Sequence, residues 1–139
     1  MAKAHKTLTV RLPAYPREKN SGISTRRLEW RSLILRAVRK QNRNGIKYQK
    51  VEPLELHVRL YLGKSALTMH DLDNRLKDIM DALQGRIGGS KARKPRNPII
   101  PNDSQVWRIL AEKGAPPPQS HGLGHLTIRP FRPARGRSV

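Results

Sequence analysis

Hydrophobic and polar residues alternate along two stretches of the chain. Residues 54–62 carry a hydrophobic residue at every even position and a polar or aromatic residue at every odd one. Residues 7–12 repeat this alternation over a shorter length and end at a proline. Successive side chains of a strand face opposite sides of its sheet. The alternation therefore predicts two strands, each with one face in the core and one in solvent.

Two other stretches repeat their hydrophobic residues every three or four positions. Between Trp30 and Val38 these residues share one helical face, which predicts a helix capped by Ser24 or Thr25 and ended within residues 42–45. Residues 72–84 carry a second stripe of this kind and are followed by three nearby glycines. The stripe predicts a second helix, and the glycines indicate where it stops.

Two more strands are expected, over residues 105–112 and 125–129. The predicted order of elements is then β-α-β-α-β-β. This order is typical of an α+β fold in which two helices pack on one face of a small mixed sheet, in two layers. We expect residues 1–129 to form a single domain and the basic, proline-rich residues 130–139 to form a disordered tail.

The charge changes this picture most. The 139 residues include 29 Lys and Arg against 10 Asp and Glu, a formal net charge of +19. A chain with this charge repels itself unless a polyanion balances it, and binding to phosphates releases counterions. A ribosomal-type RNA binder and a membrane-surface protein are alternatives. The basic residues are scattered and form no long amphipathic helix, which favours nucleic acid as the partner.

Composition excludes several other classes. The chain has no cysteine, so it has neither disulfides nor a thiolate zinc site. It contains no hydrophobic run near the roughly 20 residues of a membrane helix, and its first residues lack the hydrophobic centre of a signal peptide. We expect a soluble, cytoplasmic protein with no membrane partner.

All five aspartates lie between positions 71 and 103. They form either a salt-bridge network with nearby basic residues or a metal site. On one continuous helix, Asp71 and Asp73 would point about 200° apart. If the chain is extended through Asp71 and turns helical near Asp73, both carboxylates converge while Leu72 enters the core. Such an oxygen-rich pair beside a helix N-terminus suits Mg²⁺ or Mn²⁺.

The remaining polar residues of the second helix also allow two interpretations. Lys77 lies four residues after Asp73, where it forms an ordinary salt bridge or holds a phosphate of the substrate. Asp81 is expected to continue this stripe and Asp78 to face solvent. Of the aromatic residues, Trp30 and Trp107 are expected to anchor the core.

Two segments together resemble a known signature. Residues 70–83 read HDLDNRLKDIMDAL and residues 102–106 read NDSQV. They resemble the RusA-type crossover-junction endodeoxyribonucleases, which show D-L-D-N, a lysine one helical turn later, D-A-L, and a D-D-x-Q-V segment that opens the next strand. With the first strand and helix in the expected order, the resemblance extends to about residue 129.

The resemblance implies a function and a set of site residues. Asp71, Asp73 and Asp103 would be the catalytic carboxylates that bind Mg²⁺, or Mn²⁺ in its place, and Lys77 would be the catalytic lysine. Asn74 would either brace the turn or act in the site. Proteins of this family are homodimers that cut branched DNA, preferring four-way (Holliday) junctions. Since small resolvases of this type occur in phages, the resemblance also suggests the cytoplasm of a phage's host.

The chain departs from the family pattern in two places. Asn102 stands where the family has an acidic residue, which lowers metal affinity if that residue is a ligand. Residues 86–101 are longer than expected and form a basic loop, either a tolerated insertion or an arm that contacts DNA phosphates. The residues of this loop expected to bind DNA are Arg86, Lys91, Arg93, Lys94 and Arg96.

Two other functions stay open. A non-catalytic, basic nucleic-acid-binding protein would explain the charge but would give the aspartates no role. A RusA-like junction binder with weak cleavage would follow if Asn102 impairs the metal site.

Overall fold

The computed structural model describes residues 6–16, 23–62, 71–87, 98–118 and 123–133. Its elements follow the predicted order of strands and helices, with one 3₁₀ turn in addition. They are β1 (Leu8–Leu12), α1 (Ile23–Gln41), β2 (Leu54–Tyr61), α3 (Leu72–Leu83), the 3₁₀ turn η1 (Asp103–Gln105), β3 (Val106–Gly114) and β4 (Gly124–Pro130).

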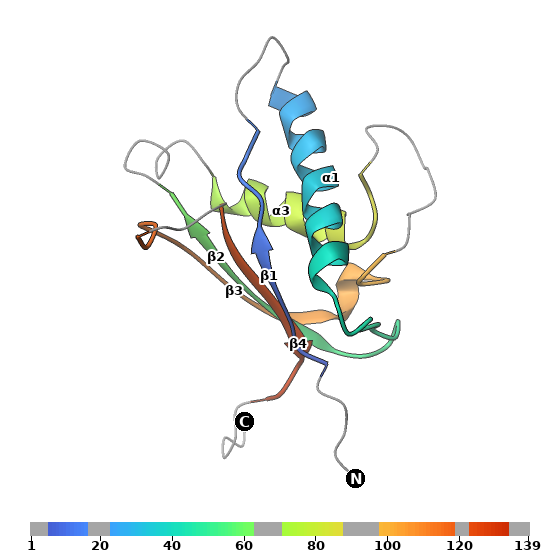
Figure 1. Cartoon of the computed structure of the whole chain (residues 1–139). Helices are drawn as coiled ribbons and strands as arrows, with labels where there is room; N and C mark the ends of the chain where they lie inside the picture. The colour runs from blue at the N-terminus through green and yellow to red at the C-terminus, as the bar shows by residue number, and fades with distance from the viewer. Residues whose placement is uncertain (1–5, 17–22, 63–70, 88–97, 119–122, 134–139) are drawn as a thin grey trace.

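The four strands form one mixed sheet in the order β1-β4-β2-β3. Strand β4 pairs antiparallel with both β1 and β2, whereas β2 and β3 are parallel. A parallel pair needs a crossover connection, and α3 supplies it. Helices α1 and α3 cover the same face of the sheet (Figure 1). The predicted α+β class, with a mixed sheet under two helices, is confirmed.

The core lies between this face and the two helices. The alternating residues of β1 and β2 are buried as predicted, and Val10 and Val58 are fully inaccessible to solvent. Trp30 from α1 and Ile79 from α3 are fully buried against these strand residues. The Trp30 indole donates a hydrogen bond to the Pro13 carbonyl (2.9 Å), so its one polar group is satisfied. The prediction of Trp30 as a core anchor is confirmed.

Some predicted boundaries and positions are wrong. Helix α1 begins at Ile23, so Ser24 and Thr25 lie inside it and neither is its cap. Trp107 is 63% exposed and lies against the ring of Phe131, not in the core. It stands beside a register shift where β3 begins, and the sheet ends there, so no layer covers it. Strand β4 runs one residue past its expected end, to Pro130.

The two edges of the sheet differ. At the β1 edge, the Gln41 side chain accepts a hydrogen bond from the backbone N–H of Arg11 (2.7 Å) and donates one to its carbonyl (3.0 Å). The C-terminal end of α1 therefore blocks that edge at Arg11. At the other edge, β3 has no strand paired to its outer side within the described residues.

Helix α3 ends as the glycines predict. Gly85 has a positive φ of 77°, which glycine adopts without a steric cost. The N–H groups of Gly85 and Arg86 donate to the carbonyls of Ala82 (2.9 Å) and Asp81 (2.8 Å), closing the last turn. Further on, the N–H groups of Ile99 and Ile100 both donate to the Leu83 carbonyl. This end of α3 therefore lies against the segment that leads into β3. No helix within the described ranges is long and hydrophobic enough to span a bilayer.

Candidate metal and nucleic-acid site

The chain changes conformation where the sequence predicts that it should, at the start of α3. Asp71 is the N-cap residue and is extended, with φ −76° and ψ 126°. The helix begins at Leu72, the first residue of the predicted helix, and Leu72 packs against the core. Asp71 and Asp73 are both exposed. The positive end of the helix dipole lies beside them and favours negative charge or a bound anion.

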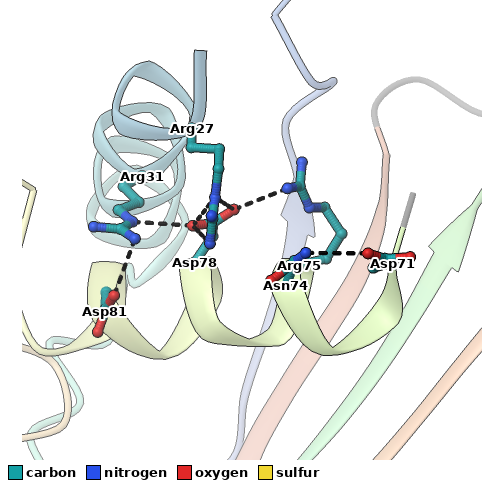
Figure 2. A network of polar contacts seen from close by, with 7 residues as sticks. All are labelled: Arg27, Arg31, Asp71, Asn74, Arg75, Asp78 and Asp81. Atoms are coloured by element: carbon teal, nitrogen blue, oxygen red, sulfur yellow. Dashed lines mark hydrogen bonds and ion pairs between the residues drawn. The ribbon is translucent and has the colours of Figure 1, made fainter. Parts of the chain in front are cut away.

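Asn74 braces this turn. Its side-chain amide donates to an Asp71 carboxylate oxygen at 3.2 Å (Figure 2). The Asp71 side chain makes no capping bond to the helix backbone. Its carboxylate is thus held by a side chain three residues later and keeps further acceptor capacity. Asn74 therefore has the structural role that was one of its two predicted roles, bracing the turn.

Helix α3 is fixed to α1 through Asp78, which is fully buried rather than solvated as predicted. Arg27 and Arg31 from α1 reach the Asp78 carboxylate at 3.1 Å, and Arg75 reaches it at 3.4 Å (Figure 2). Three cations around one buried anion offset the cost of removing that anion from water. The prediction was wrong because two of these partners, Arg27 and Arg31, come from a helix distant in sequence.

The other members of this cluster have structural contacts too. Arg31 also binds Asp81 at 3.2 Å, so Asp81 is directed to α1. The Arg75 guanidinium lies over the ring of Tyr15, 4.4 Å from its centroid, and near the Trp30 ring. These contacts, cation–π and ionic, hold the whole of α3 in one orientation. The side chains at its N-terminal end are positioned on a rigid element.

The salt-bridge interpretation of the acidic residues therefore applies only to some of them. Within the described residues, the acidic side chains engaged in ion pairs are Glu52, Glu55, Asp78, Asp81 and Glu112. No ion pair to another described residue is found for Asp71, Asp73 or Asp103. Lys77 is exposed on the same helix and does not pair with Asp73. The three carboxylates that the sequence assigns to metal, together with Glu29, are the acidic side chains without an ion pair in this part of the chain.

Asp103 lies on the η1 turn, at the other end of α3 from Asp71. The turn leads into β3, whose first residue, Val106, pairs with the first residue of β2, Leu54. Asp71, by contrast, follows the opposite end of β2, the end at Tyr61. A helix of 12 residues is about 18 Å long, and α3 spans the sheet between these two places (Figure 1). One copy of the chain does not bring Asp103 to Asp71 and Asp73.

The residues around Asp103 are built into the turn. Asn102 caps it: its side-chain oxygen accepts from the Ser104 N–H (3.0 Å), while Gln105 returns a bond to the Asn102 N–H (3.0 Å). The buried Gln105 amide also donates to the carbonyls of Gln49 (2.7 Å) and Glu52 (2.9 Å). In this reciprocal arrangement both side chains are structural. Asp103 is left exposed on the surface of the turn.

The described residues contain no group of three or more His, Asp or Glu side chains close enough to hold a metal ion. The donor types themselves fit the expected ion. Exposed carboxylates with no cation partner are the hard oxygen ligands that Mg²⁺ and Mn²⁺ prefer. Asp71 and Asp73 would supply such ligands from α3, and Asp103 would supply one from η1.

Of the basic loop, only Arg86 lies within the described residues, and it is exposed. The other four residues expected to bind DNA, Lys91, Arg93, Lys94 and Arg96, lie outside those ranges, as does His70.

A second basic surface was not predicted from the sequence. On the sheet face away from the helices, an open cleft of about 440 Å³ is lined by Arg108, Arg129 and Arg132. Glu55 in its floor binds Arg108 (3.3 Å) and Arg129 (3.2 Å) and holds them in place. A signal existed in the sequence, because Arg108 and Arg129 fall on polar-facing positions of their strands. Arginines held this way are suited to contacting phosphates.

A scan against models of protein families finds no match to this chain, and a search of curated proteins finds no match either.

Proposed function

We propose that this protein is a Mg²⁺-dependent endonuclease of the RusA type that cuts branched DNA, with four-way junctions as its preferred substrate. The observation that carries the proposal is the state of three aspartates. In a chain with net charge +19, Asp71, Asp73 and Asp103 stay exposed and form no ion pair within the described residues. The motif in which they stand supports the same function.

The chemistry would be metal-assisted hydrolysis of a phosphodiester. Asp71 and Asp73 would hold the ion, Mg²⁺ or Mn²⁺, which when bound supplies an activated water and stabilises charge on the phosphate oxygens. Because one copy keeps Asp103 at the other end of α3, Asp103 would join them only from the second copy of a homodimer. Lys77 would hold the scissile phosphate, since it is exposed one helical turn beyond Asp73. The Asp78 cluster would keep the Lys77 and Asp73 side chains in fixed positions, because its ion pairs hold α3 against α1.

DNA would bind through its backbone. The arginine cleft on the outer sheet face and Arg86 supply positive charge, and phosphate contacts of this kind position a protein without reading sequence. Recognition would then depend on the shape of the junction. Affinity should fall steeply with salt concentration because each phosphate contact releases counterions.

The test uses a labelled four-way junction and a linear duplex of the same sequence, with Mg²⁺ or with EDTA. We expect cutting of the junction in Mg²⁺ only. Asp73→Asn should retain binding and lose cutting by about 100-fold or more, as for removal of one electrostatic stabiliser of a transition state. Glu29→Gln is the matched control, because Glu29 is also exposed and has no ion pair within the described residues; its cutting rate should be unchanged.

Binding without metal-dependent cutting by the wild-type protein would contradict the proposal and favour a non-catalytic nucleic-acid-binding protein. Asn102→Asp tests the third possibility, a junction binder with weak cleavage. An aspartate retains the acceptor that caps η1, so the fold should be unaffected. A large gain in cutting at low Mg²⁺ would indicate that Asn102 limits the metal site.

A further inference from the structure

The start of β3 carries an exposed tryptophan at a bulge in the sheet. Val106 pairs with Leu54. Glu55, the next residue of β2, pairs with Arg108, so Trp107 is an extra residue in β3. A bulge of this kind turns a side chain out of the regular alternation of its strand. The Trp107 indole is 63% exposed and contributes little to the core, whereas tryptophan rings are common where a protein contacts another molecule.

An aromatic ring and a guanidinium lie next to this indole. The rings of Trp107 and Phe131 have their centroids 5.5 Å apart, at 55° to each other. The Arg108 guanidinium lies over the Phe131 ring, 4.7 Å from its centroid. The backbone N–H of Phe131 donates to the Pro53 carbonyl (2.9 Å), which fixes this part of the chain to the sheet. Trp107, Phe131 and Arg108 together form what we call the aromatic platform.

The arginine cleft adjoins the aromatic platform, because Arg108 belongs to both. Among the described residues that line the cleft, three are arginines and one, Glu55, is acidic, which leaves two positive charges in excess. The side chains of Arg108 and Arg129 are 43% and 52% exposed, while that of Glu55 is 9% exposed. The carboxylate thus orients the two guanidinium groups from below and leaves them open to a ligand. Flat rings and concentrated positive charge lie side by side.

A second group of this kind lies at the other end of the outer sheet face. The rings of Tyr61 and His125 meet edge to face, 5.2 Å apart, and the Tyr61 hydroxyl forms a hydrogen bond with the His125 Nδ1 (2.6 Å). The Arg59 guanidinium lies over the Tyr61 ring, 5.9 Å from its centroid. From Glu55 to Tyr61 the strand covers about 20 Å. Aromatic rings and arginines therefore recur along this face.

An unpaired nucleic-acid strand has the complementary chemistry. Its bases are free to stack on aromatic side chains, and each nucleotide brings a phosphate for an arginine. In a duplex the bases are already stacked on one another, so a duplex would offer this face only its phosphates.

We propose that the outer sheet face binds an unpaired stretch of a nucleic-acid strand, with one base stacked on Trp107 and the neighbouring phosphates in the arginine cleft. This binding needs neither a metal ion nor cutting. It therefore goes beyond the proposed nuclease activity and does not rest on it.

Fluorescence anisotropy in EDTA tests the stacked base. The probes are a labelled dT strand of about 12 nucleotides, a length within the usual range of such sites, an abasic strand with the same number of phosphates, the corresponding U strand of RNA, and a duplex. We expect the wild-type protein to bind the dT strand about fivefold or more tightly than the abasic strand, as for one stacked base. The tighter of the dT and U strands identifies which nucleic acid is the ligand.

Variants of Trp107 connect this preference to the platform. Trp107→Ala should bind the dT and abasic strands equally and leave binding to the duplex unchanged, whereas Trp107→Phe should retain most of the preference. Ile109→Ala is the matched control, because Ile109 is 43% exposed on the same strand but lies on the helix side, in register with Leu56. Its preference should equal that of the wild type. Circular dichroism shows whether each variant keeps the fold.

Tryptophan fluorescence gives a second readout. The chain has two tryptophans, and Trp30 is fully buried. Quenching of the emission by an unlabelled dT strand therefore reports on Trp107. We expect quenching in the wild type and in Ile109→Ala. Trp107→Phe should bind the strand without quenching.

The outcomes separate this inference from the proposed function. Equal binding of dT and abasic strands by the wild type, or a preference that survives in Trp107→Ala, would overturn the inference. So would equally tight binding of a poly-glutamate peptide of the same charge, because the site would then take an acidic protein. A wild-type protein that shows the preference and the quenching but cuts no junction in Mg²⁺ supports the inference while the proposed function fails.

Discussion

The buried Asp78 cluster gives the sharpest prediction about stability. Asp78→Asn keeps the size and shape of the side chain but removes the negative charge that Arg27, Arg31 and Arg75 share, and leaves Asp81 paired with Arg31 alone. The side chains of these arginines are 26%, 16% and 8% exposed, and that of Asp78 is not exposed at all. The substitution therefore leaves cations in a place with little solvent.

The expected cost follows from this burial. Removing one partner of a buried ion pair destabilises a protein by about 3–5 kcal/mol. A domain of this size unfolds with a free energy of roughly 5–15 kcal/mol, so about a fifth of the total or more would be lost. The midpoint of thermal unfolding should fall by roughly 10–15 °C.

Urea unfolding followed by circular dichroism measures the loss. Asp81→Asn is the matched control, because Asp81 binds the same Arg31 at 3.2 Å but its side chain is 23% exposed. A partly exposed pair of this kind contributes about 1 kcal/mol or less. A double-mutant cycle with Arg27→Met should show coupling between Arg27 and Asp78. A loss for Asp78→Asn no larger than that for Asp81→Asn would refute the reasoning.

Three further predictions concern other parts of the chain. Gly124→Ala should prevent folding or lower stability severely, because a Cβ at Gly124 would overlap the backbone carbonyl of Arg59 in the adjacent strand. In the comparison variant Gly45→Ala, the new Cβ meets no atom and strains only a positive φ, which should cost about 1–2 kcal/mol. Thermal unfolding measures the stability of both variants. Gln105→Leu should cost about 2–3 kcal/mol in urea unfolding, because the Gln49 and Glu52 carbonyls lose their donor; an unchanged midpoint would mean that water replaces the amide. Arg132→Ala should weaken binding to junction and duplex alike and reduce the salt dependence by about one phosphate contact, measured by fluorescence anisotropy; loss of binding to the junction alone would contradict a backbone role.

The sequence predicted those features that depend on nearby residues. The alternation in residues 54–62 was sufficient for β2, because each side chain is sorted by its own face of the sheet. The switch from extended to helical backbone at Asp71 was also predictable to within one residue. Both depend on the conformational preferences of a few neighbours.

Features that depend on strand order and distant contacts were not predictable. Two of the three cations around Asp78 come from 47 and 51 residues earlier in the chain, so Asp78 was expected in solvent. Trp107 was expected in the core because the sequence does not reveal that β3 is an edge strand. The separation of Asp103 from Asp71 arises from the parallel pairing of β2 with β3. A motif gives the order of its residues along the chain, and this order does not fix which of them meet in one copy.

The two edges of the sheet determine how far assembly can proceed. Gln41 occupies both backbone groups of Arg11 at the β1 edge, so a strand from another molecule cannot pair with Arg11. The β3 edge has no such block among the described residues. A sheet with two open edges grows into a fibre, whereas one open edge per copy ends growth after a single addition. The glutamine at the end of α1 would thus hinder the addition of a further strand at the β1 edge.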